Sequence, residues 1–126
     1  MTHPRLNLVV LRVADLVASE AFYARLGLSF ERHRHGSGPE HLAAQCGGAV
    51  VELYAASAER PVERSTRVGF AVDDVRSACE AVRAGGAAVL TEPAESPWGS
   101  RAVVRDPDGR AVELVEARSD EASRSS

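Results

Sequence analysis

Two glutamates, Glu52 and Glu113, stand at matching places in the chain and carry the side chains best suited to chemistry. Each belongs to a segment that runs from glycine into alternating apolar residues, "GGAVVELY" at 47–54 and "DGRAVELV" at 108–115. A carboxylate in such a strand could ligate a metal ion, line a binding pocket, act as a general base or pair with an arginine. The two segments alone leave all four roles open, so the surrounding elements have to decide between them.

The segments that open the two halves of the chain also match each other. "LNLVVLRVADLVASEAFYARLG" gives a strand, then Asp15 ahead of a helical pattern that stops at Gly27. "TRVGFAVDDVRSACEAVRAGG" repeats this order, with Asp74 before the helical pattern and Gly86 after it. Aspartate before a helix and glycine behind it are typical helix caps. Because both the openings and the endings of the halves agree, the sequence indicates an internal duplication.

Each half has room for two further strands between its opening and its ending. The residue pattern predicts these strands at 28–35, 40–46, 87–92 and 99–105. The fold class is therefore predicted as α+β, with two tandem βαβββ modules. One helix covers only one face of a module's sheet, so we expect the modules to form paired half-barrels around a cleft. The predicted boundaries are module one at 5–55, a linker at 56–64, module two at 65–117 and a disordered tail at 118–126.

Composition and charge exclude several classes of partner. The chain has 126 residues, 44% hydrophobic residues and a formal net charge of -3, which is ordinary for a globular protein of one domain. We therefore expect neither nucleic acid nor a membrane as a partner. No stretch resembles a secretory signal, so the protein is expected in the cytoplasm. Cys46 and Cys79 are too isolated in the sequence to build a zinc ribbon or a redox pair.

Four motifs follow one another along the duplicated chain, "LRVADL", "FY" with "LGL", "FAVDDV" and "WGSRAVVRDPDGRAVELVE". With these motifs in order over residues 6–117, the chain resembles the vicinal oxygen chelate superfamily, which includes glyoxalase I, extradiol dioxygenases and bacterial bleomycin-resistance proteins. The resemblance implies a paired-module fold with a cleft and, often, a homodimer. A second copy would cover edge strands that one module pair leaves open, and the two chains could exchange modules.

The resemblance also implies where a metal would be held. Metal-dependent members of the superfamily place a histidine in the first strand of each module and a glutamate or another ligand in the last strand. At the first-strand positions this chain has Leu8 and Arg67, neither of which can ligate a metal. Only Glu52 and Glu113 remain, so we predict no metal site, no other cofactor and no catalytic residue.

Strand alternation predicts the wall of the expected cleft. If Leu8 and the two glutamates face the cleft, residues at every second position face it as well. The predicted ligand-binding residues are Leu8, Val10, Arg12, Phe30, Val50, Glu52, Tyr54, Arg67, Trp98, Arg101 and Glu113. Two of them have a second interpretation, because Trp98 could anchor its loop in the core and Phe30 could pack against the helix. Phe22 and Phe70 are expected in the core.

Three histidines, His33, His35 and His41, lie close together in the sequence. His33 and His35 share one strand face, and His41 follows across the turn "GSGP", so contacts across the strands are feasible. The stretch "ERHRHG" nevertheless alternates charge and imidazole, as the surface end of a strand does. We therefore expect solvated side chains here and no metal cluster.

Two functions agree best with these features. The first is a metal-free protein of the bleomycin-resistance type, which sequesters an aromatic or quinone-type antibiotic without turnover. The second is an enzyme, either a lyase, isomerase or dioxygenase with unconventional metal ligands, or one with Glu52 or Glu113 as general base. A nearby arginine such as Arg67 would stabilise the ionised carboxylate and make it a weaker base. A third hypothesis is an accessory subunit whose cleft is filled by its own side chains. We favour the binding protein, with a small aromatic ligand.

Overall fold

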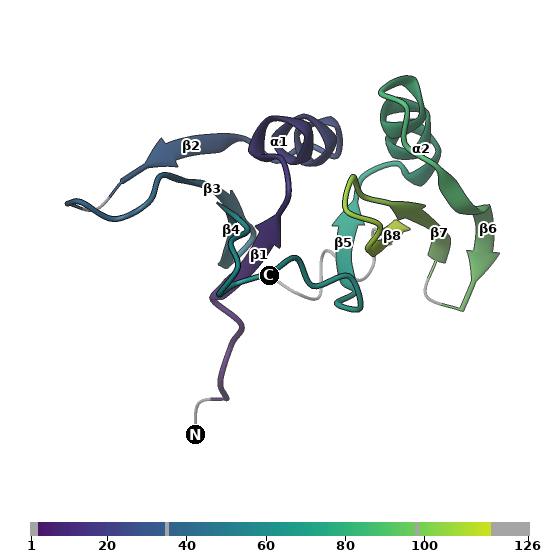
Figure 1. Cartoon of the computed structure of the whole chain (residues 1–126). Coiled ribbons are helices and arrows are strands. Elements are labelled where there is room, and N and C mark those ends of the chain that lie inside the picture. The colour runs from purple at the N-terminus through teal and green to yellow at the C-terminus, as the bar shows by residue number, and fades with distance from the viewer. Residues whose placement is uncertain (1–2, 35, 98, 117–126) are drawn as a thin grey trace. The chain divides into compact units, whose positions relative to one another are not determined.

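The computed structural model describes residues 3–34, 36–97 and 99–116, and it divides into two compact units. The first unit ends at Glu63 and the second begins at Arg64. Each unit contains one helix and one four-stranded sheet, in the order βαβββ (Figure 1). The predicted α+β fold with two βαβββ modules is therefore confirmed. The predicted tail at 118–126 lies outside the described residues, and the predicted cleft stays a prediction.

Module one is a mixed sheet with a single helix. Its elements are β1 (Leu8–Val13), α1 (Leu16–Arg25), β2 (Phe30–His33), β3 (His41–Cys46) and β4 (Ala49–Ala55). The strand order is β1-β4-β3-β2. β1 runs parallel to β4, as expected for strands joined by a helical crossover, and the other neighbours are antiparallel.

Module two repeats this topology with its own residues. Its elements are β5 (Val68–Val72), α2 (Val75–Ala84), β6 (Val89–Ser96), β7 (Gly99–Arg105) and β8 (Ala111–Glu116). The strand order is β5-β8-β7-β6, with β5 parallel to β8. The last strand of each module thus lies beside the first, which brings the glutamate-bearing strands into the middle of their sheets.

Both helices begin at the predicted aspartate caps. The Asp15 carboxylate accepts hydrogen bonds from the backbone N–H groups of Val17 and Ala18, at 3.0 and 3.2 Å. The Asp74 carboxylate accepts one from the backbone N–H of Ser77 at 3.1 Å. These bonds satisfy N–H groups that the first turn of a helix leaves without partners. The caps therefore fix the point at which each chain segment turns from strand to helix.

The core of each module lies between its helix and one face of its sheet. Alternate strand residues point to this side, and they are buried together with the inner residues of the helix. In module one these are Leu11, Val13, Phe22, Tyr23, Leu42, Ala44, Val51 and Leu53, and in module two Phe70, Val75, Cys79, Val82, Ala102, Val104, Val112 and Leu114. The core positions predicted for Phe22 and Phe70 are confirmed.

Two strands have bounds that differ from the sequence prediction by two or more residues. β2 covers Phe30–His33 and is shorter than the predicted 28–35. β6 was predicted at 87–92 but covers Val89–Ser96 and so continues through Pro93. A proline has no N–H for strand pairing, yet an edge strand tolerates it. β6 is such an edge strand, and its pairing with β7 also shifts register twice.

Candidate functional site

The face of the module one sheet that points away from α1, called the open face here, carries most of the predicted ligand-binding residues. On β1 the open-face residues are Leu8, Val10 and Arg12, and on β4 they are Val50, Glu52 and Tyr54. They alternate with helix-side residues, of which Leu11, Val13, Val51 and Leu53 are buried. Leu8 remains 46% exposed and Val10 39% exposed. The predicted sharing of one face by these six residues agrees with the burial pattern.

Four open-face side chains form one row across all strands of module one. Arg12 pairs in register with Tyr54, Tyr54 with His41, and His41 with His33. The rings of His41 and Tyr54 are stacked with 4.5 Å between centroids, and those of His33 and His41 with 5.7 Å. The Arg12 guanidinium carbon lies 4.6 Å from the centroid of the Tyr54 ring. The row, called the imidazole row here, is a continuous set of planar groups.

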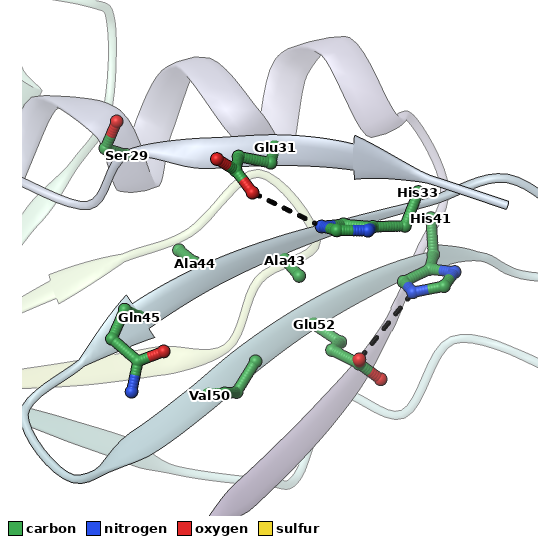
Figure 2. Close-up of a pocket in the computed structure, with 9 residues that line it drawn as sticks. All are labelled: Ser29, Glu31, His33, His41, Ala43, Ala44, Gln45, Val50 and Glu52. Atoms are coloured by element: carbon green, nitrogen blue, oxygen red, sulfur yellow. Dashed lines mark ion pairs between the residues drawn. The ribbon is translucent and has the colours of Figure 1, made fainter.

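A hollow of about 660 Å³ lies beside the imidazole row on the same face. Its lining comprises Ser29, Glu31, His33, His41, Ala43, Ala44, Gln45, Val50 and Glu52. Figure 2 shows the two histidines at one end, Ser29 and Gln45 at the other, and the alanines between them. Ala43 pairs in register with Glu52 on one side and Glu31 on the other. Because its side chain is a single methyl group, it leaves depth between these longer neighbours.

Each histidine of the hollow is accompanied by a carboxylate. His41 Nε2 lies 3.6 Å from Glu52 Oε2, and His33 Nε2 lies 3.5 Å from Glu31 Oε2 (Figure 2). Glu52 is half-buried, whereas Glu31 is exposed to solvent. The hollow can therefore offer hydrogen-bond acceptors from two sides to a ligand that lies on its alanine floor.

The prediction that the histidines are solvated is wrong for His41, which is only 3% exposed. Its cross-strand partners Tyr54 and His33 cover both faces of the ring, and this contact removes it from water. His33 is half-buried, and His35 lies outside the described residues. The register offered a signal that was missed, because counting back across the β3–β4 turn places His41 opposite Tyr54.

In module two the open face is the face of the sheet that points away from α2, and it is organised around Glu113. Its Oε1 atom accepts from Arg101, with Nε at 2.7 Å and Nη2 at 2.5 Å, and the Nη2 atom of Arg67 lies 3.7 Å away. Gly69 stands beside Glu113 in register on β5. Of the roles that the sequence left open for Glu113, the structure shows pairing with an arginine.

One predicted ligand-binding residue, Phe30, does not join the open face of its module. Phe30 pairs in register with Ala44, a buried residue whose strand neighbour Ala43 faces the hollow. The Phe30 side chain therefore belongs to the helix side of the sheet, the second of its two interpretations. Trp98 lies outside the described residues.

The turn before β8 contains a buried charge network that the sequence analysis missed. Arg110 Nη1 lies 3.1 Å from Asp106 Oδ2 and 3.3 Å from Asp108 Oδ2, and its side chain is only 1% exposed. Asp106 Oδ1 also accepts from the backbone N–H groups of Asp108 and Arg110. The network closes the turn that leads to Glu113. The spacing of two aspartates and an arginine in "DPDGR" was the available signal.

The family of the chain follows from comparison with known proteins. A family model described as the Glyoxalase/Bleomycin resistance protein/Dioxygenase superfamily matches residues 5–114. The chain belongs to this superfamily. Its recognition from motif order and duplication is thus confirmed, although no comparison tests the metal-free branch.

Relatives in this superfamily carry different names. A probable lactoylglutathione lyase of Vibrio cholerae is 31% identical, and the match covers 92% of this chain and 93% of that protein. The crystal structure of a glyoxalase/bleomycin resistance protein from Streptomyces sp. CB03234 has 26% identity and a TM-score of 0.70, with 88% and 99% coverage. An antibiotic binding protein of the same organism, TnmS3, is similar in fold at 24% identity and a TM-score of 0.70, with 94% and 99% coverage.

The positions that hold the metal in metal-dependent members of the superfamily do not fit a metal in this chain. In module one, Leu8 has no donor atom, which leaves Glu52 as the single candidate. In module two, Arg67 is a cation, and Glu113 is already held by Arg101. Within the described ranges, no group of three histidine, cysteine, aspartate or glutamate side chains could hold a metal ion. Nor does any helix there have the length and apolar character to cross a membrane.

Proposed function

We propose that the protein binds a planar aromatic small molecule without turnover and without a metal, in the manner of antibiotic sequestration. The observation that carries this proposal is the hollow of about 660 Å³ on module one, bordered by the imidazole row. Ligand sites commonly have volumes of roughly 300 to 1,000 Å³ and combine apolar area with a few polar groups.

The chemistry of the hollow suits a flat ligand with hydrogen-bond donors. Ala43 and Val50 supply apolar floor, while Glu31 and Glu52 supply acceptors on opposite sides. A hydroxylated multi-ring compound could therefore bury its rings on the floor and donate hydrogen bonds to the carboxylates. The antibiotic binding protein TnmS3, which shares the fold, supports the antibiotic class of ligand.

Sequence relatives favour one other function. The match with the probable lactoylglutathione lyase of Vibrio cholerae covers nearly the whole of both chains. A lyase is therefore the second candidate, with unconventional metal ligands or with Glu52 as a base beside His41. The substitution of Leu8 and Arg67 at the two histidine positions argues against the metal-dependent form.

Calorimetry with a soluble hydroxyanthraquinone would test the binding function. We expect saturable binding at micromolar concentration or below, which corresponds to roughly 8 kcal/mol, and recovery of the compound chemically unchanged. Ala43→Leu fills the hollow and should weaken binding by at least about tenfold, or 1.4 kcal/mol. Ala24→Leu, on the exposed side of α1, adds the same atoms elsewhere and should bind like the unaltered protein.

Two outcomes would contradict the proposal. If Ala43→Leu and Ala24→Leu bound the compound with equal affinity, the hollow would not be the binding site. The second outcome is turnover of lactoylglutathione at a rate proportional to the protein concentration when Zn²⁺ or Ni²⁺ is supplied. If Glu52→Gln abolished this turnover, the lyase would replace the binding function.

We also propose that the protein forms a homodimer. The edge strands of module one, β1 and β2, and the exposed apolar side chains of Leu6, Leu8 and Val10 support this proposal. A second copy would remove this apolar area from water and could pair an edge. Light scattering at micromolar concentration should give twice the 13.4 kDa chain mass, and a monomer mass would refute the dimer.

A further inference from the structure

We propose that the open face of module two is a binding site for an oxyanion, held by Arg67 and Arg101 with Glu113 as their positioning residue. The site stands on module two alone and does not depend on the function proposed for the hollow. It occupies a position at which metal-dependent relatives hold a cation, but its charge has the opposite sign.

Charge at the cluster is the first argument. Glu113 Oε1 lies within 4.0 Å of both guanidinium groups, so one negative charge faces two positive ones. Neither arginine has a second carboxylate within that distance among the described residues. The cluster therefore carries an excess positive charge, which an anion from solution would neutralise.

Geometry is the second argument. Arg101 uses Nε and Nη2 for Glu113, so its Nη1 donors point elsewhere and remain available. Arg67 touches Glu113 only at 3.7 Å, which is longer than a hydrogen bond, and its side chain is 58% exposed. Two planar guanidinium groups that converge on one carboxylate oxygen are arranged to share a second oxyanion between their remaining N–H groups.

Space beside the cluster is the third argument. Gly69 and Ala71, the open-face residues of β5, are both exposed. A Cβ atom built on Gly69 would meet only Glu113 within 4 Å, at 3.8 Å or more. Small residues thus leave room next to the arginines, as an oxyanion with two or more oxygen atoms requires. Carboxylates and phosphates share this chemistry.

Titration followed by ¹H–¹⁵N NMR would test the oxyanion site with benzoate and inorganic phosphate as separate probes. We expect saturable shifts of the Arg101 Nε–H signal and of the backbone amides of Gly69 and Ala71. Benzamide, the neutral analogue of benzoate, should leave these signals in place. A response to benzoate alone assigns the site to organic carboxylates, and a response to phosphate alone assigns it to phosphate groups.

A matched pair of variants separates a specific site from general charge attraction. Arg67→Gln removes one guanidinium from the cluster and should lower the affinity for the anion that binds by roughly fivefold. This is the effect expected for one charge-assisted hydrogen bond at a partly exposed site. Arg76→Gln removes an exposed arginine of α2 in the same module and should leave affinity unchanged. Equal loss in both variants, or no saturable shift with either probe, would overturn the proposal.

Discussion

Replacement of Arg110 by methionine should destabilise the protein far more than replacement of any exposed arginine. The Arg110 side chain is 1% exposed, and its two carboxylate partners, Asp106 and Asp108, are 0% and 4% exposed. Arg110→Met keeps a long apolar stem but leaves two buried carboxylates without their cation. Buried charges that lose their partner cannot recover hydration without local unfolding.

The expected loss follows from burial of the pair. Breaking a buried ion pair by removing one partner costs about 3 to 5 kcal/mol, whereas an exposed pair contributes about 0 to 1 kcal/mol. In a chain of this size, 1 kcal/mol shifts the melting temperature by about 4 °C. Arg110→Met should therefore melt about 12 to 20 °C below the unaltered protein.

Circular dichroism during urea and thermal unfolding would measure this loss. Arg105→Met is the matched control, because Arg105 lies on β7 just before the same turn, is exposed, and its side chain donates to the Gly109 carbonyl at 3.2 Å. It should change the free energy of unfolding by less than about 1 kcal/mol. A triple variant that adds Asp106→Asn and Asp108→Asn to Arg110→Met should recover part of the loss. An Arg110→Met protein as stable as the control would refute the argument.

Three further predictions follow from the helices. Asp15→Ala removes the cap of α1 and should lower the free energy of unfolding by about 1 kcal/mol in urea titrations. Asp15→Asn should retain most of the stabilisation that the cap contributes, because asparagine also caps helices. A hydrogen bond from the backbone N–H of Ser77 lowers the pKa of Asp74 below its usual 3.8. The stability that the ionised Asp74 contributes is therefore present above pH 3.8 and is lost as the pH falls through the pKa of Asp74 in the folded protein. Asp74→Asn should remove this acid dependence of the free energy of unfolding. Burial raises the pKa of the Cys79 thiol, so a Cys46→Ser variant should react with a disulfide reagent more slowly at pH 8 than a Cys79→Ser variant, and equal rates would contradict this.

The sequence was sufficient to predict the module architecture because its signals are local. The caps at Asp15 and Asp74 and the glycines behind the helices are each read from a few consecutive residues. Strand alternation then separates the helix side from the open face, since Leu11 and Val13 of β1 and Val51 and Leu53 of β4 are buried at every second position. For the same reason, the open-face placement of Leu8 and Glu52 could be predicted without a structure.

Features that depend on pairing between strands were harder to predict. His41 reads as a polar residue near a turn, and only its register with Tyr54 and His33 explains its burial. Pro93 reads as the end of a strand, but β6 is an edge strand with two register shifts and can accept it. Arg110 reads as a turn residue, although its two aspartates bury it. In each case the deciding contact lies across a hydrogen-bonded strand pair or a turn.

Comparison of the two modules explains how one fold can carry two different sites. On the helix side, Leu53 and Leu114 occupy equivalent places and are both fully buried. A smaller residue there would cost about 2 to 5 kcal/mol, so duplication preserves such positions. On the open face, Leu8 corresponds to Arg67, and neither contributes to a buried core. Exchange at these positions leaves the fold intact, which is why a histidine pair for metal can give way to an apolar residue in one module and a cation in the other. Sites in this chain therefore have to be inferred from the open-face side chains, because the two modules have the same backbone topology.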